Sequence, residues 1–155
     1  MHRRHLLLLA AAWPLREAAA HHGWSSFDQG RPIYLEGVAR NVAWRNPHVE
    51  LDLELARDLK LPADLARRPV PAQSANVDGA ALLTKAQLPT RRDRLWHIEF
   101  APLTRMQAWK VAEVRNGDRI AMVGFTFAEE KGEPVLRVEY LFVDSNTYGL
   151  RSSPA

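Results

Sequence analysis

The chain has 155 residues, with 21 Lys and Arg, 18 Asp and Glu and no cysteine, and this length is typical of one domain. The absence of cysteine excludes disulfides and thiolate metal sites. Three of the basic residues and one acidic residue lie within residues 1–20, so residues 21–155 carry 18 basic and 17 acidic side chains. This near-neutral balance excludes the strongly basic field expected of a nucleic-acid-binding domain.

The first twenty residues are typical of an export signal. Two arginines precede the apolar run "LLLLAAAWPL" at residues 6–15, which is too short to span a bilayer as a helix, since that needs roughly 20 residues. Signal peptidase requires small residues at the third and first positions before the cut, and a cut after Ala20 places alanines at both. We therefore expect residues 1–20 to be a Sec-type signal peptide. The mature protein would start at His21, would be periplasmic or secreted, and would have no transmembrane segment.

Two strands are predicted next. The stretch "IYLEGVARNVAW" (33–44) reads as a strand with a bulge at Gly37. A turn follows at "RNPH" (45–48), because proline fixes its own φ. The stretch "HVELDLEL" (48–55) alternates strictly, which predicts a strand with one apolar and one polar face. The polar face carries His48, Glu50, Asp52 and Glu54.

The middle of the chain is less regular. Residues 56–93 contain four prolines and scattered leucines, and we predict an insertion loop with a short helical turn. A loop of this length inside a small domain is either functional or mobile. The stretch "RLWHIEF" (94–100) predicts the third strand, with Leu95, His97 and Glu99 on one face and Trp96, Ile98 and Phe100 on the other.

The C-terminal part predicts a helix and two more strands. The helix covers "PLTRMQAWKVAEV" (102–114), with Thr104 as its N-cap. The strands cover residues 119–127 and 135–143, and the residues of the last strand that we assign to the core are Leu136, Val138, Tyr140 and Phe142. We expect the tail after residue 143 to be loosely held.

The order of these elements predicts the fold class. Three strands, a helix and two strands (β-β-β-α-β-β) resemble the OB-fold, a five-stranded Greek-key barrel. We therefore predict an all-β domain with one helix over residues 21–150, built as an OB-like barrel with a long insertion at 56–93. The alternative is another small barrel, or an open meander packed by one helix.

Four histidines remain after the predicted cleavage, and they are the candidate metal ligands: His21, His22, His48 and His97. At His21 the free α-amino nitrogen and the imidazole Nδ1 can hold one metal ion together. A third nitrogen completes a T-shaped set that suits Cu(II), which prefers square or tetragonal nitrogen coordination. His22 offers a second route, through the amine, the deprotonated amide and the imidazole of residue two.

The third nitrogen is expected from the second or third strand. His48 begins the second strand, and His97 lies in the middle of the third, on the same alternation as Glu99. If the polar faces of these strands coincide, both histidines share one surface with three carboxylates. We predict a copper site in which His48 completes the set from His21, with His22 or His97 as the alternate ligand. The structural interpretations are that His48 caps its turn and that His97 is a solvated strand residue.

Other chemistry has little support. The chain contains no Gly-rich phosphate loop, no HExxH motif and no nucleophile elbow, so we predict no enzyme activity. A second hypothesis is a binding module that recognises a protein, peptide or glycan through the face of the second and third strands and the loop at 56–93. Under that hypothesis the histidines are turn and surface residues.

Four stretches resemble a family of small exported bacterial proteins of unknown function: "AHHGWSSFD", "LEGVARNVAWRNPHVELDLEL", "WHIEF" and "NGDRIAMVGF". Its members carry AHH at the mature start, a later run ending in W-x-N-P-H, and a G-D strand. The resemblance covers most of residues 20–125 and implies export and a small β-rich domain, but no activity or catalytic residues. This chain is longer than the family pattern at 56–93. The pairing of AHH with NPH makes His21, His22 and His48 the preferred cluster.

Overall fold

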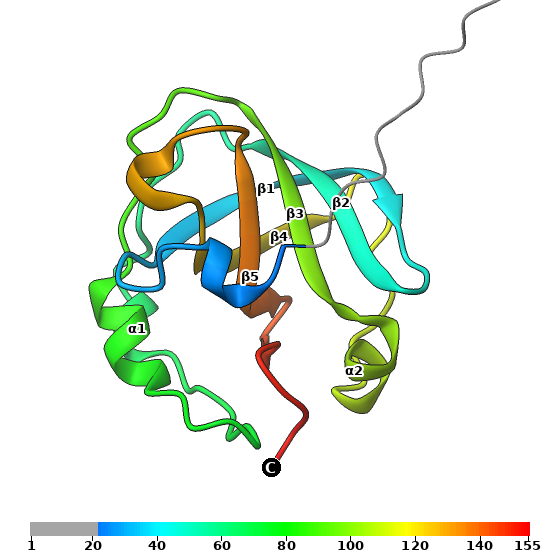
Figure 1. The fold of residues 1–155 in the computed structure, drawn as a ribbon. Helices are drawn as coiled ribbons and strands as arrows, with labels where there is room; N and C mark the ends of the chain where they lie inside the picture. The colour runs from blue at the N-terminus through cyan, green and yellow to red at the C-terminus, as the bar shows by residue number, and fades with distance from the viewer. Residues whose placement is uncertain (1–21) are drawn as a thin grey trace, which may run out of the picture.

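The structure is a computed structural model that describes residues 22–155, so the predicted signal peptide and His21 lie outside the described residues. One sheet has the strand order β3-β2-β1-β4-β5-β6, and a pairing between β3 and β5 closes its first five strands into a barrel (Figure 1). The strands are β1 (Ile33–Ala43), β2 (His48–Leu55), β3 (Leu95–Pro102), β4 (Arg119–Phe125), β5 (Val135–Val143) and β6 (Asn146–Gly149).

The predicted fold class is confirmed. All neighbouring strands pair antiparallel except β3 and β5, which are parallel and align Ile98 with Leu136. This closing pair excludes the open meander. Helix α2 (Leu103–Ala108) lies between β3 and β4 and contributes the buried Met106 to the barrel core, which gives the expected β-β-β-α-β-β order with β6 added at the end.

The barrel interior is filled by the apolar alternation of β2 and β3. The fully enclosed residues that alternate along these strands, at 0–2 % exposure, include Val49, Leu51, Leu53, Trp96, Ile98 and Phe100. Burial of apolar surface on this scale is the dominant favourable contribution to folding. Since side chains alternate across a strand, the polar residues that alternate with these core residues face outward.

The predicted bulge at Gly37 is wrong. Gly37 keeps regular register with both neighbouring strands, whereas the register shift in β1 lies between Arg40 and Ala43, where Asn41 has a φ of 48°. A Cβ on Gly37 would lie 2.1 Å from the carbonyl oxygen of Glu54. Glycine is therefore required here because the β2 backbone approaches closely.

The insertion is more ordered than the sequence indicated. It contains the 3₁₀ turn η2 (Leu65–Arg67) and the helix α1 (Gly79–Lys85), which lies against the side of the barrel (Figure 1). Its leucines pack on the outer face of β1, β4 and β5, in a cluster with Tyr34, Val123, Tyr140 and Phe142. The insertion therefore covers the outer face of β1, β4 and β5.

The four β5 residues assigned to the core are all buried, but they divide between two clusters. Leu136 and Val138 face the barrel interior, but the register of β5 against β4 shifts at Glu139. Beyond this shift the alternation reverses, so that Leu141 faces inward while Tyr140, like Phe142, faces outward beneath the insertion. A bulge has this effect because one extra residue changes which side chains face the core.

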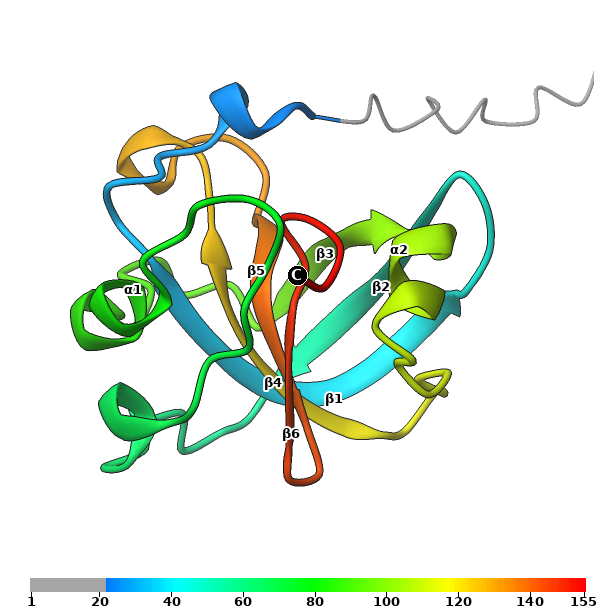
Figure 2. The same cartoon turned by 90° about the horizontal axis from the view of Figure 1, so that it is seen from below.

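The helix and the tail also differ from expectation. Helix α2 ends at Ala108, six residues earlier than predicted, and Pro102 rather than Thr104 is its N-cap residue. The tail is not loose. It forms β6, buries Leu150 completely, and accepts a hydrogen bond of 2.8 Å from Trp109 Nε1 at the carbonyl of Ser152. Figure 2 shows the tail running beside the insertion, where Gln73 and Pro154 form a β-bridge.

Candidate functional site

The first described residues are bound to the outside of the barrel. His22 Nδ1 lies 2.9 Å from Oε1 of Glu99, a β3 residue that is only 2 % exposed. The turn η1 (Trp24–Ser26) follows, and Phe27 is buried with Phe125 and Val135. The segment that follows the predicted cleavage site is therefore held on the barrel surface.

A chain of four side chains holds this segment, and we call it the N-terminal clamp: His22, Glu99, Arg137 and Trp24. Glu99 Oε2 lies 3.6 Å from Nη1 of Arg137, its register partner in β5. The Arg137 guanidinium lies 5.1 Å from the ring centroid of Trp24, a cation–π distance. Burial lowers the pKa of Arg137, and the Glu99 carboxylate opposes this shift. The clamp thus begins and ends on the N-terminal segment.

A second set of contacts joins the clamp to the C-terminal segment. The Arg151 guanidinium also lies over the Trp24 ring, at 3.9 Å from the ring centroid. Its Nε donates to the fully buried Glu139 at 2.7 Å, and its Nη1 donates to Gln29 at 2.7 Å. Trp24 therefore contacts two guanidinium groups that are each paired with a buried carboxylate.

The outward face of β2 and β3 is the polar surface that the sequence predicted. Glu50 pairs with Glu99, and Asp52 pairs with His97, so the four side chains share one face. His97 Nδ1 lies 3.5 Å from Asp52 Oδ1, and its Nε2 lies 3.8 Å from Glu50 Oε2. Glu50, Asp52 and His97 line a pocket of about 390 Å³, which Asn41 also lines.

His48 lies at one end of this face. It begins β2 opposite Pro102, and a register shift separates it from Glu50. Two residues along a strand span about 7 Å, so His48 lies about that far from the Glu50–Glu99 pair along β2. The predicted ligands His22, His48 and His97 thus all lie on or over the β2–β3 face.

The ligand set is incomplete without His21, which lies outside the described residues. Among residues 22–155, no three His, Asp or Glu side chains are arranged to hold a metal ion. The contact with Glu99 occupies Nδ1 of His22, which competes with the chelate through the amine, the amide and the imidazole of residue two. Because the Glu99 carboxylate contacts Nδ1, Nε2 of His22 is the ring nitrogen that remains to bind a metal ion, as in many metal-binding histidines.

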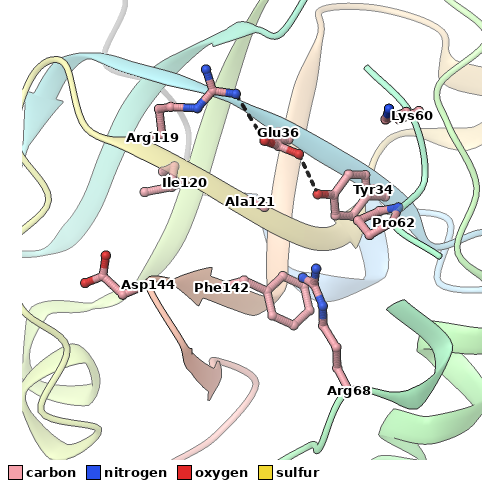
Figure 3. A pocket seen from close by; sticks show the side chains of 10 residues that line it. All are labelled: Tyr34, Glu36, Lys60, Pro62, Arg68, Arg119, Ile120, Ala121, Phe142 and Asp144. Atoms are coloured by element: carbon pink, nitrogen blue, oxygen red, sulfur yellow. Dashed lines mark hydrogen bonds and ion pairs between the residues drawn. The ribbon is translucent and has the colours of Figure 1, made fainter. Parts of the chain in front are cut away.

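A pocket of about 410 Å³ lies between the insertion and the outer face of β1, β4 and β5 (Figure 3). The Tyr34 hydroxyl donates to Glu36 at 2.9 Å, and Arg119 donates to the other oxygen of the same carboxylate at 3.2 Å. Arg68 lies over the Phe142 ring, at 4.8 Å from its centroid. Burial, and then the Glu36 carboxylate, raise the pKa of Tyr34 far above its usual value, so the phenol remains a donor at neutral pH.

Arg137, Glu139 and Arg151 were not among the residues predicted from the sequence. A signal was present, because the first two lie within "VLRVEYLFV", where every residue from Val135 to Phe142 is buried. Charged residues are almost never fully buried unless they are paired. An arginine and a glutamate inside such a strand therefore indicate an ion-pair network.

The fold and the clamp define a small closed β-barrel with its N-terminal segment bound to the outer surface. Residues 9–61 match the model of a family of unknown function, DUF6152. The match supports the expected similarity to an uncharacterised family, and it ends before the expected G-D strand at residues 117–120. No curated protein and no solved structure matches the chain. Within residues 22–155, the helices are too short or too polar to cross a membrane.

Proposed function

We propose that the protein is exported, that its mature form begins at His21, and that it binds Cu(II) in the periplasm through its N-terminal histidine cluster. The observation that carries this proposal is the contact of 2.9 Å between His22 and Glu99. This contact attaches the residue after the proposed N-terminus to the strand that carries His97. The neighbouring strand begins at His48.

The available donors fit Cu(II). Imidazole nitrogens suit this ion, and the β2–β3 face adds carboxylates that can orient them. Because three described ligands do not converge, the proposal needs His21 to supply its amine and ring nitrogen. His48 would supply the third nitrogen, with His97 or His22 as the alternate. The Glu99 contact at Nδ1 of His22 makes the Cu(II) chelate through that nitrogen weaker than the chelate formed by His21.

The proposed role is storage, delivery or sensing of copper without catalysis. Bound Cu(II) would draw its nitrogen ligands into their deprotonated forms and release protons. The clamp would hold the N-terminal segment against the barrel before the ion arrives, and such preorganisation reduces the ordering cost of binding. This function is compatible with a domain that lacks any recognisable catalytic motif.

A Cu(II) titration tests the proposal. The protein beginning at His21 is compared with the same protein acetylated at its N-terminal amine, with calorimetry for affinity and EPR for the nitrogen ligands. We expect the acetylated control to bind roughly 100-fold more weakly, which corresponds to about 2.7 kcal/mol, since its blocked amine can no longer bind the ion. His48→Ala should then remove one nitrogen from the EPR signal. Equal affinities of the two proteins would reject the copper proposal.

The pocket beneath the insertion favours a second candidate function, a module that binds a protein, peptide or glycan. Its lining combines an apolar floor at Ala121 and Phe142 with charged groups of both signs. Ala121→Trp would fill this pocket without touching the clamp. If the module proposal is right, ligands found on peptide or glycan arrays lose binding in this variant, while Cu(II) affinity is unchanged. Ligands that bind both proteins equally would reject the pocket as the binding site.

A further inference from the structure

Charge is unevenly distributed along the described chain. Residues 56–94, which comprise the insertion and Arg94, contain eight Lys and Arg against four Asp. The rest of residues 22–155 contains ten Lys and Arg against thirteen Asp and Glu. The nearly neutral total therefore conceals a basic insertion on an acidic barrel, and an excess of one sign on one surface favours partners of the opposite sign.

Part of this basic charge surrounds a small pocket. It has a volume of about 220 Å³ and lies where β2 ends and β3 begins. Apolar side chains, among them Leu59 and Leu88, form part of its lining. The charged residues of the lining are Arg57, Arg91, Arg92, Asp93 and Arg94. The single acid is already paired, because Asp93 Oδ2 lies 2.6 Å from Nε of Arg91.

The three other arginines remain available to a ligand. Arg57 and Arg92 are exposed and make no hydrogen bond or ion pair with any residue between 22 and 155. Arg94 uses Nη2 to donate to the carbonyl of Leu55 at 2.6 Å. That bond fixes its guanidinium near the pocket and leaves its other N–H groups available.

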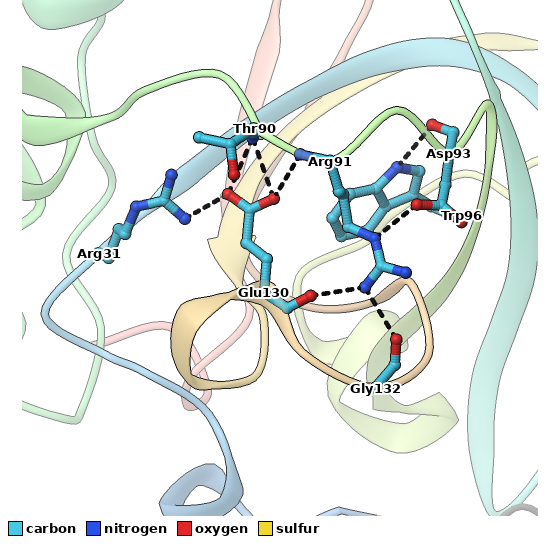
Figure 4. Close-up of polar contacts among 7 residues, drawn as sticks. All are labelled: Arg31, Thr90, Arg91, Asp93, Trp96, Glu130 and Gly132. Carbon is cyan, nitrogen blue, oxygen red and sulfur yellow. Dashed lines mark hydrogen bonds and ion pairs between the residues drawn. The ribbon is translucent and has the colours of Figure 1, made fainter.

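The loop that carries Arg92 is fixed by hydrogen bonds to the segment that contains Glu130 and Gly132 (Figure 4). The buried Glu130 carboxylate accepts hydrogen bonds from the backbone amides of Thr90 and Arg91, at 2.9–3.0 Å. The Arg91 guanidinium donates in return to the carbonyls of Glu130 and Gly132, at 2.9 and 3.0 Å. The loop is therefore fixed before any ligand binds, which lowers the entropic cost of binding.

We propose that this pocket binds a phosphate monoester group, held by Arg57, Arg92 and Arg94. Guanidinium groups bind phosphate oxygens through paired hydrogen bonds. Three guanidinium groups supply more hydrogen-bond donors and more positive charge than a single carboxylate ligand requires. The apolar part of the lining would accept the first carbons attached to the phosphate. A long polyanion is disfavoured because the rest of the described surface carries excess acid. The phosphate can belong to a soluble ester or to a lipid headgroup.

The test uses inorganic phosphate as the first probe, with NMR of the ¹⁵N-labelled protein beginning at His21 at constant ionic strength. We expect saturable shifts at the amides of residues 55–59, 88 and 90–94. Arg57→Gln/Arg92→Gln should weaken this binding about tenfold or more, because two charge-assisted hydrogen bonds are lost. Neither side chain makes a hydrogen bond or ion pair within residues 22–155, so the variant should melt at the temperature of the unsubstituted protein.

The control variant is Lys110→Gln/Arg115→Gln. It removes the same charge from exposed positions after α2, at the opposite end of β3 from the pocket. We expect it to bind phosphate normally. Shifts that do not saturate, or an equal loss of binding in both variants, would overturn the proposal.

The two sources of phosphate are distinguished by comparing glycerol 3-phosphate with vesicles. A soluble source predicts that glycerol 3-phosphate binds at least as tightly as phosphate and that vesicles do not bind. A headgroup source predicts that phosphatidylcholine vesicles containing phosphatidic acid bind the protein, and that Arg57→Gln/Arg92→Gln abolishes this. Equal binding to phosphatidylserine vesicles of the same charge density would overturn the proposal, because it would indicate attraction to surface charge alone.

Discussion

His22 and Glu99 are 77 residues apart in the sequence, and their side chains are 2.9 Å apart in the structure. Glu99 is the centre of the N-terminal clamp, since it contacts His22 with one oxygen and Arg137 with the other. It faces outward from β3, yet it is only 2 % exposed, because the N-terminal segment covers it. The first residues of the described chain are therefore part of the folded domain.

Glu99→Gln is expected to destabilise the protein by about 2–4 kcal/mol. The substitution preserves shape but leaves Arg137 buried without its charge partner, and breaking a buried pair is costly. Urea unfolding measures the effect, with Glu54→Gln as the control, because Glu54 forms an exposed pair with Arg40 and such pairs contribute at most about 1 kcal/mol.

A double variant separates the effect of the ion pair from the effect of the position. Glu99→Leu/Arg137→Met removes both charges together, and replacing a buried pair by apolar residues is often nearly neutral. We therefore expect the double variant to recover most of the stability lost in Glu99→Gln. If Glu99→Gln costs no more than Glu54→Gln, the clamp does not stabilise the domain.

The sequence was sufficient for the polar β2–β3 face. The alternation of β2 and β3 determines which side chains face outward, and antiparallel pairing of consecutive strands is the usual arrangement. Together these placed His97 and Glu99 beside Asp52 and Glu50, as the register confirms. Such a prediction succeeds because it depends only on local periodicity and on one short-range topological rule.

The contacts of the clamp and the packing of the tail cannot be predicted from sequence periodicity. Nothing in the local sequence indicates that Trp24 contacts Arg137 or that Leu150 enters the core, because both contacts join segments that are distant in the sequence. The reversal within β5 has a similar origin, since Glu139 occupies a bulge that alternation alone does not reveal. Contacts between distant segments therefore limited the predictions more than errors in strand assignment did.

Leu150→Ala is expected to destabilise the protein by about 2–5 kcal/mol, the usual range for truncating a fully buried leucine. Leu150 is 0 % exposed, and its amide donates to the Glu139 carbonyl at 2.7 Å. Thermal unfolding measures the loss. Leu95→Ala is the matched control, because Leu95 is 50 % exposed and should cost less than about 0.5 kcal/mol. Similar losses in both variants would mean that the tail does not belong to the core.

Glu130→Gln is expected to reduce stability at neutral pH and to weaken its dependence on acid. Burial of Glu130 raises its pKa, but hydrogen bonds from the Thr90 and Arg91 amides, together with Arg31, outweigh this, so the pKa lies below its usual value of 4.5. A carboxyl group with a lowered folded-state pKa stabilises the fold above its unfolded pKa. This stabilisation is lost as the pH falls through the lower, folded-state pKa.

Urea unfolding between pH 7 and pH 3 tests this expectation for Glu130. The difference in unfolding free energy between the unsubstituted protein and Glu130→Gln should be constant above about pH 5 and should shrink below the usual carboxyl pKa. Glu129→Gln serves as the control, since the Glu129 side chain is 71 % exposed and its loss should leave the acid dependence unchanged. A difference that stays constant down to pH 3 would show that the Glu130 charge does not stabilise the loop that holds Arg91 and Arg92.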